Sequence, residues 1–182
     1  MCSAGEGRSF CIGHDRTAIA DHESAPSRRF EPETVNMLEV LSIPTTARIR
    51  GHCYTGGLAL ASDILVGGVS ARLGDTHGQL GLVPIWGVSV RLPERVGRST
   101  AKELMYTSRR IDATMAADIG LVDHVVPDDD LDKAIDGLAS EIAVNSPGLI
   151  GSSRRRSSIT TSGVEALRLT PIVRCYVAVR LT

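Results

Sequence analysis

The amino-acid sequence predicts an α/β domain in which a sheet and helices form packed layers. Strand-like and helical segments alternate through residues 45–145, which is the pattern of a layered α/β protein. The chain has 182 residues, of which 42% are hydrophobic, so it is long enough for one domain with a substantial core.

The first half of the chain predicts three strands and a helix. Residues 8–15, RSFCIGHD, read as a strand that runs into a loop, and the polar residues 16–31 read as a loop or lid. Pro32 opens a helical pattern of apolar residues, which Pro44 ends. Two further strands are expected where β-forming residues gather, at 45–50 and 64–68.

A glycine-rich connection leads into the helical second half. Residues 73–87 are not periodic and predict an irregular surface connection. A helix is expected over about 88–96. Thr100 and Glu103 have the spacing of a capping box, which predicts the start of the next helix.

The last predicted elements end near residue 147. Asp112 is the expected N-cap of a short helix that Gly120 closes. Residues 121–126 read as a strand ended by Pro127. An amphipathic helix follows, with one apolar face made of Leu131, Ile135, Leu138 and Ile142.

Composition and motifs exclude several classes of function. A net charge of −1 gives no general attraction to nucleic acid or membranes, and aromatic residues, at 3%, are too few for base-stacking platforms. The basic stretch 152–158, SSRRRSS, is interpreted as a solvated tail. No apolar run is long enough to span a bilayer, and no secretory signal pattern opens the chain, so we expect a cytoplasmic location.

The four cysteines have no metal-binding or redox spacing and are expected to be reduced thiols: Cys2, Cys11, Cys53 and Cys175. The sequence contains no complete GxSxG elbow, Walker A loop or Rossmann glycine fingerprint. Serine hydrolases and nucleotide-binding classes are therefore disfavoured.

Residues 51–64, GHCYTGGLALASDI, place paired glycines, Gly56 and Gly57, directly before a short apolar helix start. Glycines at a helix start carry no Cβ and leave backbone amides free, so a ligand can approach the chain closely. The alternative is a tight turn that binds nothing.

Three segments, taken in their order along the chain, resemble the crotonase superfamily of enoyl-CoA hydratases and isomerases. They are GRSFCIGHD, GHCYTGGLALASDILVG and GDTHGQLGLVPIWGVSVRLPERVG. The resemblance covers residues 5–147. It implies a ββα spiral core that binds acyl-CoA thioesters, in homotrimers or hexamers. Coenzyme A would enter as part of the substrate, with no other cofactor and no metal.

The resemblance also implies an oxyanion hole, in which two backbone amides stabilise the negative charge that develops on the thioester oxygen. One amide would belong to His14 and the other to Gly56, with Gly57 beside it. Trp86 falls in the segment that forms the pocket wall, where it would contact the acyl group. Packing in the core is the alternative for Trp86, and His52 and Tyr54 are expected to pack or to line the pocket.

Both glutamates that act as acid and base in family hydratases are missing. The first position holds Leu58–Ala59. The stretch from the glycine pair to Ser62–Asp63 is two residues shorter than in the family, and such a loss rotates a helix by roughly 200°, so a neighbouring residue is not expected to substitute. The second position falls at about His77. Asp75 and His77 are the remaining titratable candidates for proton transfer, unless both only bond to the local backbone.

Family members carry two strands and a helix before the first motif, so the N-terminal strands are expected to be incomplete. We expect an incomplete acyl-CoA-binding core at 1–147 with C-terminal helices, and a divergent tail at 148–182. The expected function is an enoyl-CoA hydratase/isomerase-like protein with weak or absent hydration. The alternative is a non-catalytic acyl-CoA-binding or assembly subunit.

Overall fold

A parallel four-stranded sheet forms the centre of the protein. The structure is a computed structural model that describes residues 1–13, 30–55, 57–84, 86–146, 148 and 150–151. The strand order is β1-β2-β4-β7, and every neighbouring pair is parallel. These strands are β1 (Cys2–Ala4), β2 (Thr46–Ile49), β4 (Ile64–Gly68) and β7 (His124–Val126).

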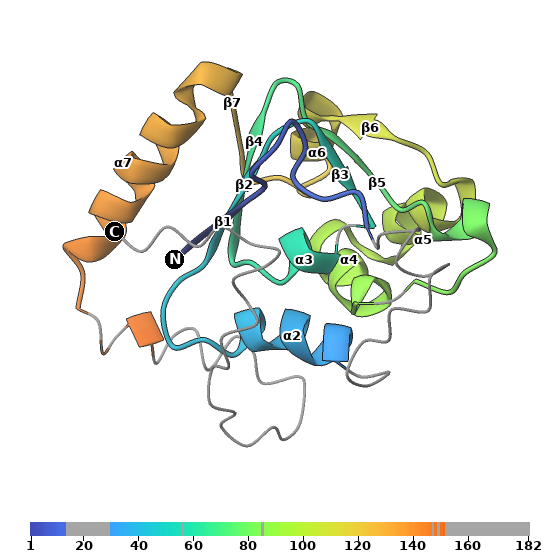
Figure 1. Cartoon of the computed structure of the whole chain (residues 1–182), viewed down its shortest axis with the longest axis horizontal. Helices are drawn as coiled ribbons and strands as arrows, with labels where there is room; N and C mark the ends of the chain where they lie inside the picture. Colours follow the sequence, from blue (N-terminus) through green and yellow to red (C-terminus); the bar gives the residue numbers. More distant parts are fainter. Residues whose placement is uncertain (14–29, 56, 85, 147, 149, 152–182) are drawn as a thin grey trace.

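A second, three-stranded sheet lies beside the first (Figure 1). It contains β3 (His52–Tyr54) in parallel with β5 (Arg72–Gly74), and β5 antiparallel to β6 (Ile111–Asp112). Cys11 adds a single parallel bridge to Cys53 on the free side of β3. Because short parallel strands need covering on both faces, this sheet depends on the helices around it.

Helices cover both sides of the main sheet. Figure 1 shows α7 along one side and α3, α4 and α5 on the other, with α2 below. The helices are α2 (Phe30–Glu39), α3 (Gly57–Leu60), α4 (Val88–Val96), α5 (Arg98–Thr107), α6 (Ala113–Asp118) and α7 (Leu131–Ala143), with 3-10 turns η1 (His77–Leu80) and η2 (Asp128–Asp130).

The main core lies between the two sheets and the helices α3, α4 and α5. Ala47, Ile49 and Leu65 of β2 and β4 are fully buried there, together with Ala101 and Leu104 of α5. On the other side of the sheet, Leu131 and Ile135 of α7 pack against Val66. Both faces of the sheet at β2 and β4 are thus covered, one by the main core and the other by α7, as expected for a parallel sheet.

Several sequence predictions are confirmed. Helix α4 spans the predicted residues 88–96, and β4 spans the predicted 64–68. The Asp112 carboxylate accepts a hydrogen bond of 2.9 Å from the Met115 amide, as an N-cap should. Gly120 has a φ of +75°, the left-handed conformation that favours glycine at a helix end.

Other predictions were wrong at particular residues. The capping box at Thr100 is not used, because Gly97 alone separates α4 from α5 and the helix begins earlier, at Arg98. Of the strand predicted at 8–15, only Cys11 pairs within the described part, since the amides of Phe10 and Cys11 both donate to the His52 carbonyl. The helix predicted from Pro32 starts at Phe30. Strands β1, β3, β5 and β6 were missed.

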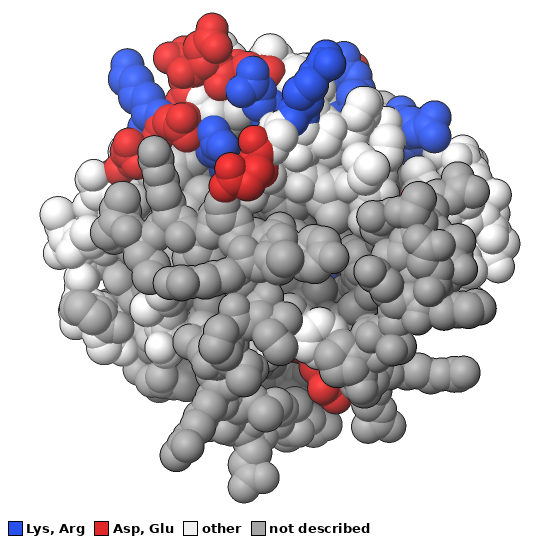
Figure 2. All heavy atoms as spheres, viewed as in Figure 1, with Lys and Arg blue, Asp and Glu red and all other residues white. Residues whose placement is uncertain are grey.

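Charged side chains of both signs mix along one edge of the face shown in Figure 2. Exposed pairs such as Arg48–Asp132 (2.9 Å) and Arg109–Glu103 (2.9 Å) each contribute little, about 0–1 kcal/mol. Within the described residues, no helix has both the length and the apolar character needed to cross a membrane.

Candidate active site

Three of the segments singled out in the sequence meet at one edge of the second sheet. Cys11, β3 and β5 run parallel, and each is followed at its carboxyl end by one of these segments. The segments are Gly13, the turn at 55–57, and the loop that carries Asp75 and His77. Carboxyl ends of parallel strands lie together, which is where α/β proteins commonly bind ligands.

The first two segments touch directly. Gly13 has a φ of +97°, and a Cβ at this position would lie 2.8 Å from Oγ1 of Thr55. Glycine therefore allows the first loop to pack against the second turn. The predicted oxyanion donors, His14 and Gly56, lie outside the described residues, so their role stays a prediction. Their chain neighbours Gly13, Thr55 and Gly57 are close together.

Thr55 holds a strained backbone conformation in this turn. Its φ is +59°, which is unusual for a β-branched residue. The strain costs about 1–3 kcal/mol and persists only where the surroundings enforce it. Here the Thr55 amide donates to the Gly74 carbonyl (3.0 Å), and the hydroxyl donates to the Tyr54 carbonyl (2.5 Å). Such strain is common at functional sites.

Gly57 opens α3 against the Trp86 backbone. A Cβ on Gly57 would lie 2.5 Å from the Trp86 Cβ and 2.8 Å from its carbonyl oxygen. Trp86 is partly buried and packs on a small cluster made of Val35, Leu38 and Ala61. Core packing, the alternative for Trp86, is thus observed, whereas contact with an acyl group stays a prediction.

Asp75 and His77 form a buried, hydrogen-bonded pair. Their side chains are only 3% and 4% exposed, so the prediction of a surface connection over 73–87 was wrong at these residues. Asp75 Oδ1 accepts from the His77 amide (3.1 Å) and lies 2.5 Å from His77 Nδ1. If the Asp75 carboxylate is ionised it only accepts hydrogen bonds, so that Nδ1 would be the donor and Nε2 of a neutral ring would keep its lone pair.

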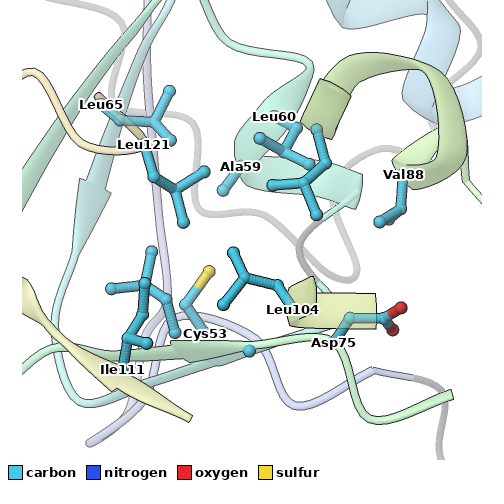
Figure 3. Close-up of a pocket in the computed structure, with 12 residues that line it drawn as sticks. Cys53, Ala59, Leu60, Leu65, Asp75, Val88, Leu104, Ile111 and Leu121 are labelled. Carbon is cyan, nitrogen blue, oxygen red and sulfur yellow. The ribbon is translucent and has the colours of Figure 1, made fainter. Parts of the chain in front are cut away.

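The second Asp75 oxygen has no partner. Oδ2 is buried and makes no hydrogen bond within the described residues. The residue lines a mainly apolar cavity of about 30 Å³ that also touches Ala59, Val88 and Leu104, and Figure 3 shows Asp75 at its end opposite Leu121. A buried oxygen without a partner is costly, and such atoms in native proteins require an explanation.

The family model of enoyl-CoA hydratase/isomerase matches residues 3–156. The chain belongs to this family. A probable peroxisomal enoyl-CoA hydratase of Arabidopsis thaliana is 36% identical over 148 residues, which are 80% of this chain and 56% of that protein.

Solved structures of the enoyl-CoA hydratase/isomerase family share the fold. An enoyl-CoA hydratase from Bacillus anthracis aligns with a TM-score of 0.76 at 32% identity, covering 87% of this chain and 64% of that one. A Thermobifida fusca protein of the enoyl-CoA hydratase type, solved in complex with CoA, aligns with a TM-score of 0.75 at 30% identity, covering 85% and 65%. The crotonase-like α/β fold is thereby confirmed. The chain spans a little over half the length of the curated relatives it matches.

Ala59 occupies the position where the family resemblance places the first glutamate. It lies in the four-residue helix α3, is 2% exposed, and lines the same cavity as Asp75. A methyl group there neither donates nor accepts a proton. The resemblance places the second glutamate at about His77. At the two glutamate positions, the described residues therefore offer only the Asp75–His77 pair for proton transfer.

His52 and Tyr54 point away from the core, because side chains alternate along β3 and Cys53 between them is buried. Their rings lie 5.0 Å apart, and the Arg110 guanidinium lies over the Tyr54 ring at 5.2 Å. This stacking was missed in the sequence, since Arg110 lies 56 positions from Tyr54. Of the two expected roles, packing or lining the pocket, these contacts show packing of the two rings, and lining of a substrate pocket stays a prediction.

The thiols near the site are not activated. Cys2, Cys11 and Cys53 are free, and Cys175 lies outside the described residues. Burial raises the pKa of the Cys53 thiol far above its ordinary value, and burial likewise raises the pKa of Cys11. A buried neutral thiol is a poor nucleophile. Within the described residues, no group of three or more His, Cys, Asp or Glu side chains could hold a metal ion.

Proposed function

We propose that this chain binds a CoA thioester and stabilises its enolate with the backbone amides of His14 and Gly56. The observation that carries the proposal is the contact between Gly13 and Thr55, which brings the two loops together at the edge that also holds Asp75 and His77. The neighbour in complex with CoA supports the same ligand class. Coenzyme A enters as part of the substrate, and the reaction needs no further cofactor.

His77 is the base in this proposal. Its Nε2 takes a proton from the α-carbon. The electron pair of that C–H bond forms the C=C bond of the enolate, and the π pair of the carbonyl moves to the thioester oxygen, where the two amides stabilise the charge. The proton then returns to the α-carbon or, in an unsaturated thioester, to the γ-carbon. Asp75 fixes the ring and its tautomer through Nδ1. One base can therefore support isomerisation.

Thioester binding has a direct spectroscopic test. Titration with acetoacetyl-CoA, which enolises readily, should produce a new ultraviolet absorption as the enolate forms in the site. Gly56→Val should abolish this absorption, because a branched side chain would crowd the oxyanion position. An unaltered spectrum of the native protein at millimolar ligand would contradict the proposal.

Hydration of an enoyl-CoA should be slow. Syn-hydration needs one group to activate water and another to protonate the α-carbon, and Ala59 supplies neither. Loss of such a group costs about 10²–10⁴-fold. Crotonyl-CoA should therefore be hydrated far below the ~10 s⁻¹ of a typical enzyme. The rate is measured as the loss of the enoyl absorbance. A rate near that value would show that another residue replaces the glutamate.

The second candidate function is a non-catalytic acyl-CoA-binding or assembly subunit. It is favoured by the absence of a carboxylate at position 59, which Ala59 occupies, and it predicts the acetoacetyl-CoA spectrum without any turnover.

We also propose a cytoplasmic homotrimer or hexamer that acts in fatty acid metabolism, without nucleic-acid or membrane partners. The exposed apolar side chains that follow η1 support self-association, since Leu82 and Val83 are 54% and 77% exposed.

A further inference from the structure

Arg91 is a buried cation that joins three segments near the candidate active site. It lies on α4, and its guanidinium donates to Glu39 Oε2 (2.6 Å from Nη2 and 3.2 Å from Nε). It also donates to Asn36 Oδ1 (2.7 Å) and to the Trp86 carbonyl (2.7 Å). A buried charge is costly unless it is paired and hydrogen-bonded, and Arg91 meets both conditions.

The bond to the Trp86 carbonyl acts on the turn that faces Gly57. Trp86 and Gly87 both have left-handed φ values, +57° and +75°, and this conformation is unfavourable for tryptophan. The Arg91 guanidinium, which belongs to α4, donates a hydrogen bond to the carbonyl of this strained turn and so restrains it. The same carbonyl lies 2.8 Å from where a Gly57 Cβ would be, so its position limits where the glycine turn can sit.

The bonds to Glu39 and Asn36 act on α2. This helix is the next described element after Gly13, so it follows the stretch of chain that contains His14. Apolar contacts from Val35 and Leu38 of α2 reach Trp86 and Leu58, on the same side of the site. Arg91 therefore connects the helix after one proposed oxyanion donor to the turn beside the other.

We propose that Arg91 is a positioning residue that fixes α2 and the Trp86–Gly87 turn relative to Gly57, and so sets the geometry of the oxyanion hole. The effect on thioester chemistry rests on the proposed function above. The effect on the turn itself does not, because it concerns the free protein. The two parts can therefore be tested separately.

Trp86 is the chain's only tryptophan, so its fluorescence reports on this turn alone. Glu39→Gln and Arg91→Lys should each increase the quenching of Trp86 fluorescence by acrylamide, because they weaken the bonds that hold the turn. Glu33→Gln is the matched control, since Glu33 is an exposed glutamate on the same helix. Circular dichroism shows whether each variant is folded. Glu39 is partly exposed, so Glu39→Gln can still test the proposal if Arg91→Lys unfolds.

The second measurement is α-proton exchange of a CoA thioester in D₂O. A small misplacement of catalytic groups costs up to about 10²-fold, so kcat for exchange should fall by about 10–100-fold in both variants, with a smaller change in KM. Glu33→Gln should exchange at the native rate. A purely structural role would lower the amount of folded protein but leave kcat per folded molecule unchanged.

The outcomes separate the two ideas. Quenching in Glu39→Gln and Arg91→Lys equal to that of Glu33→Gln overturns the proposal, whatever the ligand does. Increased quenching with native kcat overturns the link to the oxyanion hole. If the native protein neither forms the enolate nor exchanges protons, the proposed function fails, and the quenching result alone decides whether Arg91 positions the turn.

Discussion

Replacing His77 with glutamine should abolish α-proton exchange in a CoA thioester. Glutamine keeps a similar size but has no basic nitrogen, so the base that takes the proton is lost. Removal of a positioned acid/base group costs about 10²–10⁴-fold. The measurement is the NMR signal of the α-protons of butanoyl-CoA in D₂O, followed with time at equal concentrations of folded protein.

Two further variants make this test specific. His124→Gln removes an exposed histidine on β7 and should leave exchange unchanged. Asp75→Asn keeps the base but replaces the carboxylate that accepts from Nδ1 at 2.5 Å, so it should slow exchange less than His77→Gln does. Native exchange in His77→Gln would show that another group takes the proton, whereas enolate absorption without any exchange by the native protein would favour the binding-subunit function.

The sequence predicted the elements whose signals are local. Helix α4 and strand β4 have clear periodicity or β-rich composition, and the Asp112 cap depends on residues only three apart. Strands β1, β3, β5 and β6 were missed because two or three residues give no alternation to read. Their pairing is decided by partners distant in sequence, as between Cys2 and Thr46.

The candidate site was predicted in part. The family resemblance singled out two loops, and in the structure Gly13 and Thr55 of these loops lie against each other, while the oxyanion role of His14 and Gly56 stays a prediction. The burial of Asp75 and His77 could not be predicted, because the sequence around them is polar and glycine-rich. Arg91 was missed for a related reason. An arginine on an amphipathic helix is normally solvated, and its partners lie 52 and 55 positions earlier in the chain.

The second large effect is expected at Gly57. A methyl group there would lie 2.5 Å from the Trp86 Cβ and 2.8 Å from its carbonyl oxygen, and a backbone atom cannot move aside cheaply. Gly57→Ala should therefore push α3 and the preceding turn out of place. Losing one oxyanion donor costs about 10²–10³-fold in rate, so the acetoacetyl-CoA absorption and the α-proton exchange should both be lost. Overpacking should also lower the free energy of unfolding by about 1–3 kcal/mol.

Gly137→Ala is the matched control for this substitution, because a Cβ at Gly137 in α7 would meet no atom of the described residues within 4 Å outside the nearby backbone of its own helix. That variant should gain up to about 1 kcal/mol of stability, since alanine favours the helix more than glycine does. Trp86→Gly combined with Gly57→Ala removes the shorter of the two contacts and suits the positive φ at position 86, so it should recover part of the enolate absorption. Urea unfolding and acetoacetyl-CoA titration of the four proteins measure both effects. A native enolate absorption in Gly57→Ala would mean that the glycine turn does not bind the thioester oxygen, because the displaced amide could no longer reach it.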